Sequence, residues 1–248
     1  MNVSFYTAAV GAREQQSHLD VVANNISNVN TTGFKAERAS FSSLMYQNML
    51  GIDEEELPRG VGAQMIAATT DFSSGALMST FGAQDYAIQG EGFFALLDGT
   101  TGEVSYTRDG SFTAGGLQEA TGETDEFGFP VYEQKLYLTD GSGRFVLSRY
   151  GQMIEVTDIN AEYPVGVFDF VNTDGMRHVG GNRFVPVEKN GQVRVGTGTA
   201  IHKMLEGSNV DLADEISKMI EAQRMYSYAL RMVSVSEEVE NTVNNLRN

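Results

Sequence analysis

The chain has 248 residues, no cysteine and a formal net charge of −16, from 33 acidic and 17 basic residues. Without cysteine it can form no disulfide and has no thiol nucleophile or thiolate metal ligand. The acidic net charge argues against a protein that binds nucleic acids or anionic membranes, because both are bound through clustered lysine and arginine.

The first predicted element is an amphipathic helix from residue 1 to about residue 29. No positively charged leader precedes Arg13 and no apolar run follows it, so we expect any export to proceed without a cleaved signal peptide. Small or apolar residues recur at alternating spacings of three and four, which is a heptad pattern. This seam consists of Phe5, Ala8, Ala12, Gln15, Leu19, Val22, Ile26 and Val29. The segment Asn30–Gly33 then ends the helix, and its glycine suits a left-handed turn.

Residues 36–70 are predicted to form an extended connector. The stretch MLGIDEEELPRGVGAQM combines an acidic run, a proline and several glycines, which favours an exposed arm or loop. The carboxylates of Asp53–Glu56 lack the alternating spacing of a calcium loop, so a solvated loop is preferred over a cation site.

Residues 71–204 are predicted to form an antiparallel β-rich domain. Short runs of Val, Thr, Phe and Tyr alternate with glycine-containing turns, a pattern typical of many short strands. Asp109-Gly110, between Tyr106 and Phe112, is a strong hairpin signal. Asp174-Gly175 and Asn190-Gly191 are two further predicted turns.

A second long helix is predicted within residues 205–248. Ser208 or Asn209 suits its N-cap, and acidic residues follow in the first turn. One apolar pattern runs through Leu212, Ile216, Met219, Gln223, Tyr226, Leu230 and Val233, and from Met232 a second stripe continues through Val235, Val239 and Leu246. A helix of about 35 residues greatly exceeds the globular mean and needs a partner along its length. We expect the terminal helices to pair as a coiled coil, with the remaining apolar surface contacting further copies of the chain.

Patterns typical of catalysis or cofactor binding are missing, so we expect no enzyme, no cofactor and no metal site. None of His18, His178 and His202 has a metal-binding spacing. The sequence has no Gly-x-Ser-x-Gly elbow, and its Gly-x-Gly pairs open no βαβ unit. Two alternatives stay open: a secreted β-rich glycan hydrolase using a pair of carboxylates, and a surface adhesin with a helical stalk.

Three motifs, in order along the chain, resemble one family. ANNISNVNTTGFK (residues 23–35) closely resembles the N-terminal signature of the bacterial flagellar axial proteins, the rod and hook family, with Ser27 where the family usually has alanine. FSSGALMSTFGAQDYAIQGEGFFALL (72–97) and YTRDGSF (106–112) resemble the beginning of the family's β domain. LEGSNVDL (205–212) and MIxxQRxY (219–226) resemble its C-terminal signature. Residues 116–191 match only weakly.

The resemblance implies a structural subunit of the flagellar basal-body rod. Such subunits assemble with copies of themselves into a helical tube that transmits torque from the motor to the hook, with the terminal helices inside and the β domain outside. The implied partners are other rod and hook subunits, ring (bushing) proteins and the flagellar type III export apparatus. The length favours a rod protein over a longer hook protein. The connector favours the distal rod over the proximal rod, and we expect the termini to be disordered before assembly.

Two groups of residues are therefore the candidate site. The predicted assembly interface consists of Phe5, Leu19, Val22, Asn24, Asn25, Ile26, Asn28, Val29, Leu212, Ile216, Met219, Gln223, Arg224, Tyr226, Leu230 and Val233. The predicted chain-exit turn consists of Asn30, Thr31, Thr32, Gly33 and Phe34. Asparagine is a weak helix former, so we interpret the amides of residues 24, 25 and 28 as groups that bond to adjacent subunits without burying charge. The alternative is that Asn28 and Asn30 only cap the helix and form a turn.

Overall fold

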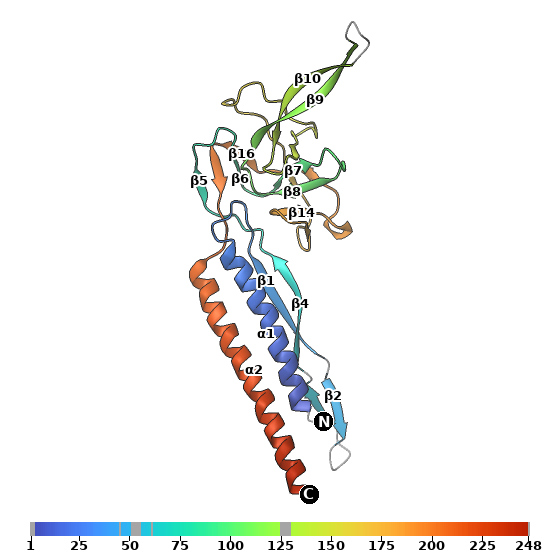
Figure 1. Cartoon of the computed structure of the whole chain (residues 1–248), viewed down its shortest axis with the longest axis vertical. Helices are drawn as coiled ribbons and strands as arrows, with labels where there is room; N and C mark the ends of the chain where they lie inside the picture. Colours follow the sequence, from blue (N-terminus) through green and yellow to red (C-terminus); the bar gives the residue numbers. More distant parts are fainter. Residues whose placement is uncertain (1–2, 45, 51–55, 61, 125–129, 248) are drawn as a thin grey trace. The chain divides into compact units, whose positions relative to one another are not determined.

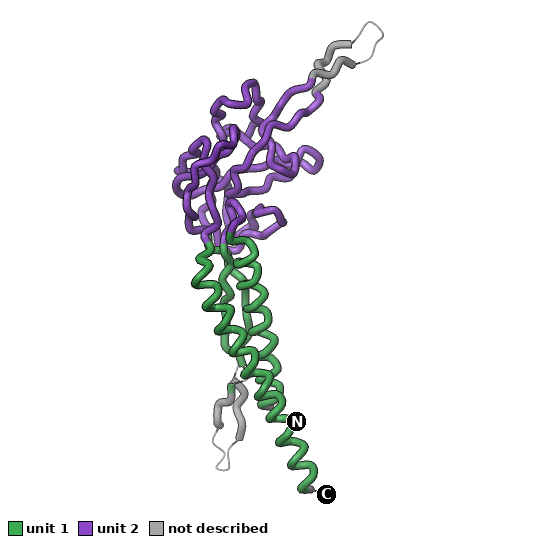
Figure 2. Tube along the Cα trace, turned by 60° about the vertical axis from the view of Figure 1, so that its left-hand side comes forward, with its two compact units in different colours: residues 1–29, 36–71, 210–248 green, residues 30–35, 72–209 purple. Residues whose placement is uncertain are grey.

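A computed structural model describes residues 3–44, 46–50, 56–60, 62–124 and 130–247 (Figure 1). The chain divides into two compact units (Figure 2). Unit 1 comprises residues 1–29, 36–71 and 210–248, and unit 2 comprises residues 30–35 and 72–209. Long helices near both termini and a central antiparallel β-rich region confirm that part of the predicted fold class.

Unit 1 contains both long helices, α1 (Val3–Ser27) and α2 (Leu212–Arg247). They run antiparallel, because the Oγ atoms of Ser4 and Ser236 lie 3.2 Å apart while Asn25 bonds to Glu215 near the opposite ends. Among the residues that the structure describes, no helix is long and apolar enough to span a membrane.

The N-cap of α2 differs from the prediction. Asp211 caps the helix, since its Oδ1 accepts the backbone N–H groups of Ala213 at 2.9 Å and Asp214 at 3.3 Å. The amide of Asn209, one of the two predicted caps, instead donates to the carbonyl oxygen and hydroxyl of Ser73. An aspartate serves both as a cap and as a favourable charge at the positive end of a helix dipole, which explains its preference here.

The segment predicted as an arm or loop contains two pairs of strands. In unit 1, β1 (Glu37–Ser43) pairs with β4 (Ala63–Thr70), and β2 (Tyr46–Leu50) pairs with β3 (Glu56–Gly60). The sequence hides β1 and β4 because most of their side chains are exposed, so no apolar alternation marks them. The β1–β4 pair contacts α1, where the Glu14 carboxylate accepts the N–H of Met65 at 2.7 Å. Residues 53–55 of the acidic run lie outside the described residues.

Unit 2 is built on a nine-stranded sheet with β7 (Phe93–Leu97) at its centre. The other strands are β8 (Val104–Thr107), β9 (Thr113–Thr124), β10 (Pro130–Thr139), β11 (Phe145–Val146), β12 (Val167–Asp169), β13 (Arg177–His178), β14 (Arg183–Val185) and β15 (Arg194–Val195). Two smaller sheets pair β5 (Leu77–Ser79) with β17 (Met204–Glu206), and β6 (Tyr86–Gln89) with β16 (Thr199–His202). A 3-10 turn, η1, spans Glu188–Asn190.

Strand β7 separates two apolar cores, because successive side chains of a strand point to opposite faces. Phe94 and Leu96 join a cluster with Leu138 and Val146 on one face. Phe93 and Ala95 join a second cluster on the other face, with Tyr106, Leu147, Phe170, Met176 and Phe184. Unit 2 therefore has its own core and needs no helix from unit 1 to bury this strand.

The predicted hairpin at Asp109-Gly110 is wrong. Strand β8, before this dipeptide, pairs with β7 and β14 and not with β9 after it. The carboxylate of Asp109 accepts the N–H and the hydroxyl of Ser111, which turns the chain locally. A Cβ on Gly110 would lie 1.7 Å from the carbonyl oxygen of Tyr86, so glycine is needed here for a close backbone approach.

Candidate assembly interface

The face of α2 that packs on α1 is formed by small and polar residues. Ala222 is 1% exposed, and Ser236 and Glu215 are also buried, while Ala229 and Val233 are partly buried. These positions repeat at near-heptad spacing, and small side chains there leave room for the backbones of the two helices to approach closely. The apolar stripe predicted for this helix therefore does not form most of its contact with α1.

Most of the predicted α2 interface is instead exposed in the single chain. Leu212, Ile216, Met219, Gln223, Arg224 and Leu230 are exposed, whereas Tyr226 and Val233 are partly buried. The exposed large apolar side chains, from 37% exposure at Met219 to 82% at Leu246, are Leu212, Ile216, Met219, Ile220, Met225, Tyr228, Leu230, Met232, Val235, Val239, Val243 and Leu246. Monomeric proteins rarely leave so many large apolar side chains of one helix uncovered, so their exposure indicates an interaction surface.

On α1, which contacts both α2 and the β1–β4 pair, the predicted residues are more enclosed. Val22 and Asn25 are buried, Phe5, Leu19, Ile26, Asn28 and Val29 are partly buried, and Asn24 is exposed. The side-chain amide of Asn28 donates to the carbonyl oxygen of Asn24 at 2.9 Å and to its side-chain oxygen at 3.1 Å. Whether Asn24 and Asn28 also bond to adjacent subunits stays a prediction.

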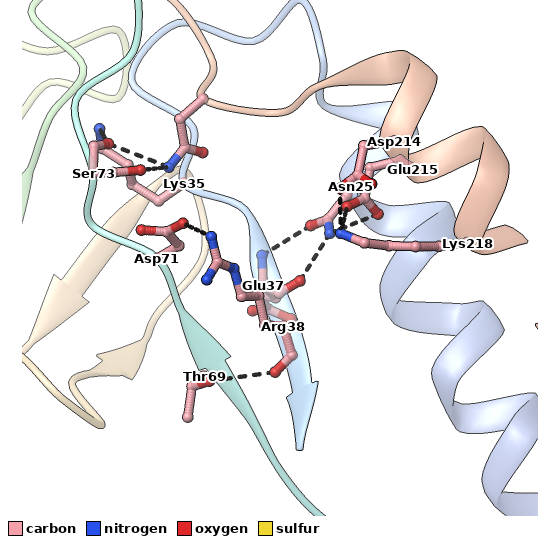
Figure 3. Close-up of polar contacts among 11 residues, drawn as sticks. Asn25, Lys35, Glu37, Arg38, Thr69, Asp71, Ser73, Asp214, Glu215 and Lys218 are labelled. Atoms are coloured by element: carbon pink, nitrogen blue, oxygen red, sulfur yellow. Dashed lines mark hydrogen bonds and ion pairs between the residues drawn. The ribbon is translucent and has the colours of Figure 1, made fainter. Parts of the chain in front are cut away.

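Asn25 bonds within its own chain (Figure 3). Its Nδ2 donates to the carbonyl oxygen of Glu37 at 2.8 Å and to Glu215 Oε2 at 3.1 Å, and its Oδ1 accepts the N–H of Glu37 at 2.9 Å. The amide thus forms the two backbone hydrogen bonds that a neighbouring strand would form with the first residue of β1, and it also bonds to α2. Whether Asn25 also contacts adjacent subunits stays a prediction.

The carboxylate of Glu215 is shared with Lys218, whose Nζ lies 2.8 Å from Glu215 Oε1 and 2.7 Å from Asp214 Oδ2. The hydrogen bond to Asp214, and then the one to Glu215, raises the pKa of Lys218. Around the buried Asn25 and Glu215, this end of the helix pair is therefore a polar network of amide, carboxylate and ammonium groups (Figure 3). Its members do not belong to the apolar pattern, so periodicity could not reveal them.

The chain-exit turn forms part of unit 2. Gly33 has φ of 65°, which confirms the predicted left-handed conformation, and its N–H donates to the carbonyl oxygen of Glu206 at 2.8 Å. The Thr32 hydroxyl donates to Asp109 Oδ1 at 3.0 Å. A Cβ on Gly33 would lie 2.3 Å from the backbone nitrogen of Asp109, so no larger residue fits. Asn30 is exposed, Thr31 is partly buried and Phe34 is buried.

Next to this turn lies a cluster of buried charges that the sequence analysis missed. Lys35 Nζ is 2.7 Å from Glu206 Oε1, and Arg108 Nη1 is 3.0 Å from Glu206 Oε2. All three side chains are at most 3% exposed. They stand within the motifs at residues 23–35, 106–112 and 205–212, but a charged residue gives no sequence signal of burial. In the described part of the chain, no three His, Cys, Asp or Glu side chains are grouped to hold a metal ion.

Three known sequence families match separate parts of the chain. Residues 5–35 match the family described as flagella basal body rod protein, residues 87–126 match the flagellar hook protein FlgE/F/G D1 domain, and residues 202–246 match the flagellar basal body rod FlgEFG protein C-terminal family. The first and last matches cover α1 with the exit turn and nearly all of α2. The features described above therefore lie in the matched segments.

Full-length relatives agree with these matches. The chain is 35% identical to the flagellar basal-body rod protein FlgG of Borreliella burgdorferi, over 98% of both chains. It is 32% identical to FlgG of Agrobacterium fabrum, over 95% of this chain and 96% of the relative. It is also 28% identical to the flagellar hook-basal body complex protein FlhP of Bacillus subtilis, over 98% and 99%.

Long terminal helices with an exposed apolar face, a separate β unit and these similarities define a structural protein of the bacterial flagellum, of the rod and hook class. The chain belongs to the flagellar basal-body rod protein family. It is accordingly a structural subunit of the rod, located in the flagellar basal body.

Proposed function

We propose that this subunit assembles with further copies of itself into a helical tube that transmits torque from the motor to the hook. The observation that supports this proposal is the exposed apolar stripe of α2, which no described segment of its own chain covers. In a tube, the stripe would be buried against the helices of neighbouring copies, as a coiled-coil layer. Burial of apolar surface is the dominant favourable term in association of this kind.

We propose that the segments of the chain have different roles, divided at the predicted boundaries. We propose that residues 1–35 and 205–248 form the inner helical layer, residues 36–70 a connector specific to rod proteins, and residues 71–204 the outer β layer. The distal rod is the preferred position, because the connector contains two pairs of strands, one of which, β1–β4, contacts α1. The proximal rod is the second candidate.

The proposed subunit acts by assembly, without catalysis. Its partners are other rod and hook subunits, with the type III export apparatus as the route of delivery and ring (bushing) proteins as neighbours of the rod. A β-rich glycan hydrolase and an adhesin are the competing functions. Activity of the purified chain on peptidoglycan would favour the first, and small defined oligomers with a ligand would favour the second.

The test is deletion of the gene, followed by electron microscopy of isolated basal bodies and a swimming assay. We expect truncated rods without hooks, rescued by the full gene and not by a gene that lacks residues 208–248. A sharper version rescues with Leu230→Ser combined with Met219→Ser, which makes the stripe polar, and compares it with Glu221→Ser on the same helix. Only the stripe variant should fail to form rods, and normal swimming with that variant would contradict the proposal.

A further inference from the structure

One buried carboxylate, that of Glu206 on β17, binds three separate segments of unit 2. Its Oε1 accepts Lys35 Nζ at 2.7 Å and the N–H of Gly75 at 2.8 Å, and its Oε2 accepts Arg108 Nη1 at 3.0 Å. Lys35 directly follows the exit turn, Gly75 precedes β5 and Arg108 follows β8. A single side chain therefore joins parts of the chain that are far apart in sequence.

Backbone hydrogen bonds tie the same segments together. The N–H of Gly33 donates to the carbonyl oxygen of Glu206 at 2.8 Å, and the N–H of Gly207 donates to that of Ala76, also at 2.8 Å. Lys35 Nζ, besides its contact with Glu206, donates to the carbonyl oxygen of Ser73 at 2.7 Å. The chain enters and leaves unit 2 through these segments. It enters from α1 by the exit turn and from β4 by residues 73–76, and it leaves for α2 by residues 205–209.

The cluster contains two positive charges and one negative charge, so its members have different roles. Two cations, Lys35 and Arg108, share the one carboxylate of Glu206, and Arg108 also donates from Nη2 to the carbonyl oxygen of Gly90 at 2.8 Å. Removal of the carboxylate would take from two buried cations the negative group that both contact, which is strongly destabilising. Removal of the Lys35 ammonium would leave a balanced Arg108–Glu206 pair. Lys35 thus attaches the exit turn without being needed to balance the charge of the β unit.

We propose that Lys35, Glu206 and Arg108 form a clamp that holds the exit turn on unit 2 before the terminal helices pair. All three residues and the segments they join belong to unit 2, which has its own apolar core, so the clamp can form without α1 or α2. Helix α1 ends at Ser27 and α2 begins at Leu212, each only a few residues from the clamp. The connections to both helices therefore start at the clamp.

Hydrogen exchange of the full-length chain, kept monomeric at low concentration, tests the clamp. In the wild-type chain we expect the amides of Gly33 and Gly75 to be protected, because both are hydrogen-bonded in the clamp region. Lys35→Met keeps the apolar stem but removes the ammonium group, and should speed exchange across residues 30–35 and 73–76 by about tenfold or more. Lys189→Met, at an exposed lysine of the same unit, is the matched control and should change neither segment.

Strand β7 supplies the internal reference, and its amides should change by less than about twofold in Lys35→Met. A second variant, Gly33→Ala, should release the exit turn by steric conflict with Asp109 and speed exchange in the same segments. Unprotected Gly33 in the wild-type monomer would overturn the proposal. So would unchanged exchange in both variants, or an equal loss of protection in β7, which would make the cluster a general stabiliser of the unit. The measurement needs no assembled rods, so its failure would leave the proposed function untouched.

Discussion

At the scale of single residues, the hydrogen bonds of one buried polar side chain connect α1 with β1 and α2 in unit 1. Asn25 is buried, yet it satisfies both backbone groups of Glu37 and one oxygen of Glu215. Each of these groups would lose its partner if the amide were removed, and a buried unsatisfied polar group costs about 1–3 kcal/mol. The asparagine is therefore a specificity element that fixes where β1 begins beside α1.

We predict that Asn25→Leu disturbs unit 1 more than its added apolar surface stabilises it. The leucine cannot form hydrogen bonds with the Glu37 backbone, so we expect the free energy of unfolding to fall by about 2–4 kcal/mol. Rods should be fewer and swimming slower in a strain that carries the variant. Asn160→Leu, at an exposed asparagine outside the predicted interface, is the control and should swim normally. Equal swimming of the two variants would mean that the Asn25 amide contacts have no role in assembly.

Two glycines of unit 2 allow a prediction that does not involve assembly. Gly110→Ala should lower the stability of the β unit by about 2–4 kcal/mol, because its Cβ would overlap the Tyr86 carbonyl oxygen at 1.7 Å. Gly141→Ala has no atom within 4 Å of its new Cβ and should change stability by less than about 0.5 kcal/mol. Denaturant unfolding of the two variants, followed by tyrosine fluorescence, makes the comparison. A larger loss of stability in Gly141→Ala than in Gly110→Ala would contradict the close packing of Gly110 against Tyr86.

At the scale of elements, periodicity predicts that a helix or strand exists better than it predicts its neighbour. The apolar spacing of residues 212–233 correctly indicates a helix, but in the single chain Ala222 and Ser236 face α1 and the stripe lies outside. Alanine and serine give a weaker hydrophobic signal than the large apolar residues of α2, so the periodicity indicated the stripe and not the small-residue contact. The reverse holds for β1 and β4, whose exposed side chains conceal two strands. Buried charges such as Lys35 escape prediction because a long-range contact balances them.

The small-residue face of α2 makes a specific prediction. Ala222→Leu should force the helices apart, because the alanine is 1% exposed and overpacking costs about 1–3 kcal/mol or more. Ala213→Leu, on an exposed position of the same helix, adds the same side chain without meeting α1. We expect Ala222→Leu alone to reduce the number of completed rods in isolated basal bodies. Loss of rods in both variants would contradict the prediction, because the effect would then not depend on contact with α1.

At the scale of the whole molecule, the two units differ in how completely they bury their large apolar side chains within a single chain. Unit 2 buries both faces of β7 and has two apolar clusters of its own. In unit 1, the 36-residue α2 contacts α1 through small and polar side chains and leaves its large apolar side chains exposed. Long helices derive most of their stability from packing of an apolar face. The formal charge of −16 also opposes association of free subunits at low salt.

These differences predict that the terminal helices become fully formed only as subunits associate. In the dilute monomer, the far-ultraviolet ellipticity at about 222 nm should fall short of the value for helices of 25 and 36 residues. It should rise with protein concentration and with salt, which screens the acidic charge. Sedimentation measured on the same samples would tie the rise to association. The Leu230→Ser, Met219→Ser variant should show no rise, because its stripe can no longer be buried favourably. Full helicity in a sample that sediments as a monomer would contradict the prediction, and would mean that the small-residue contact with α1 is sufficient to fold α2 alone.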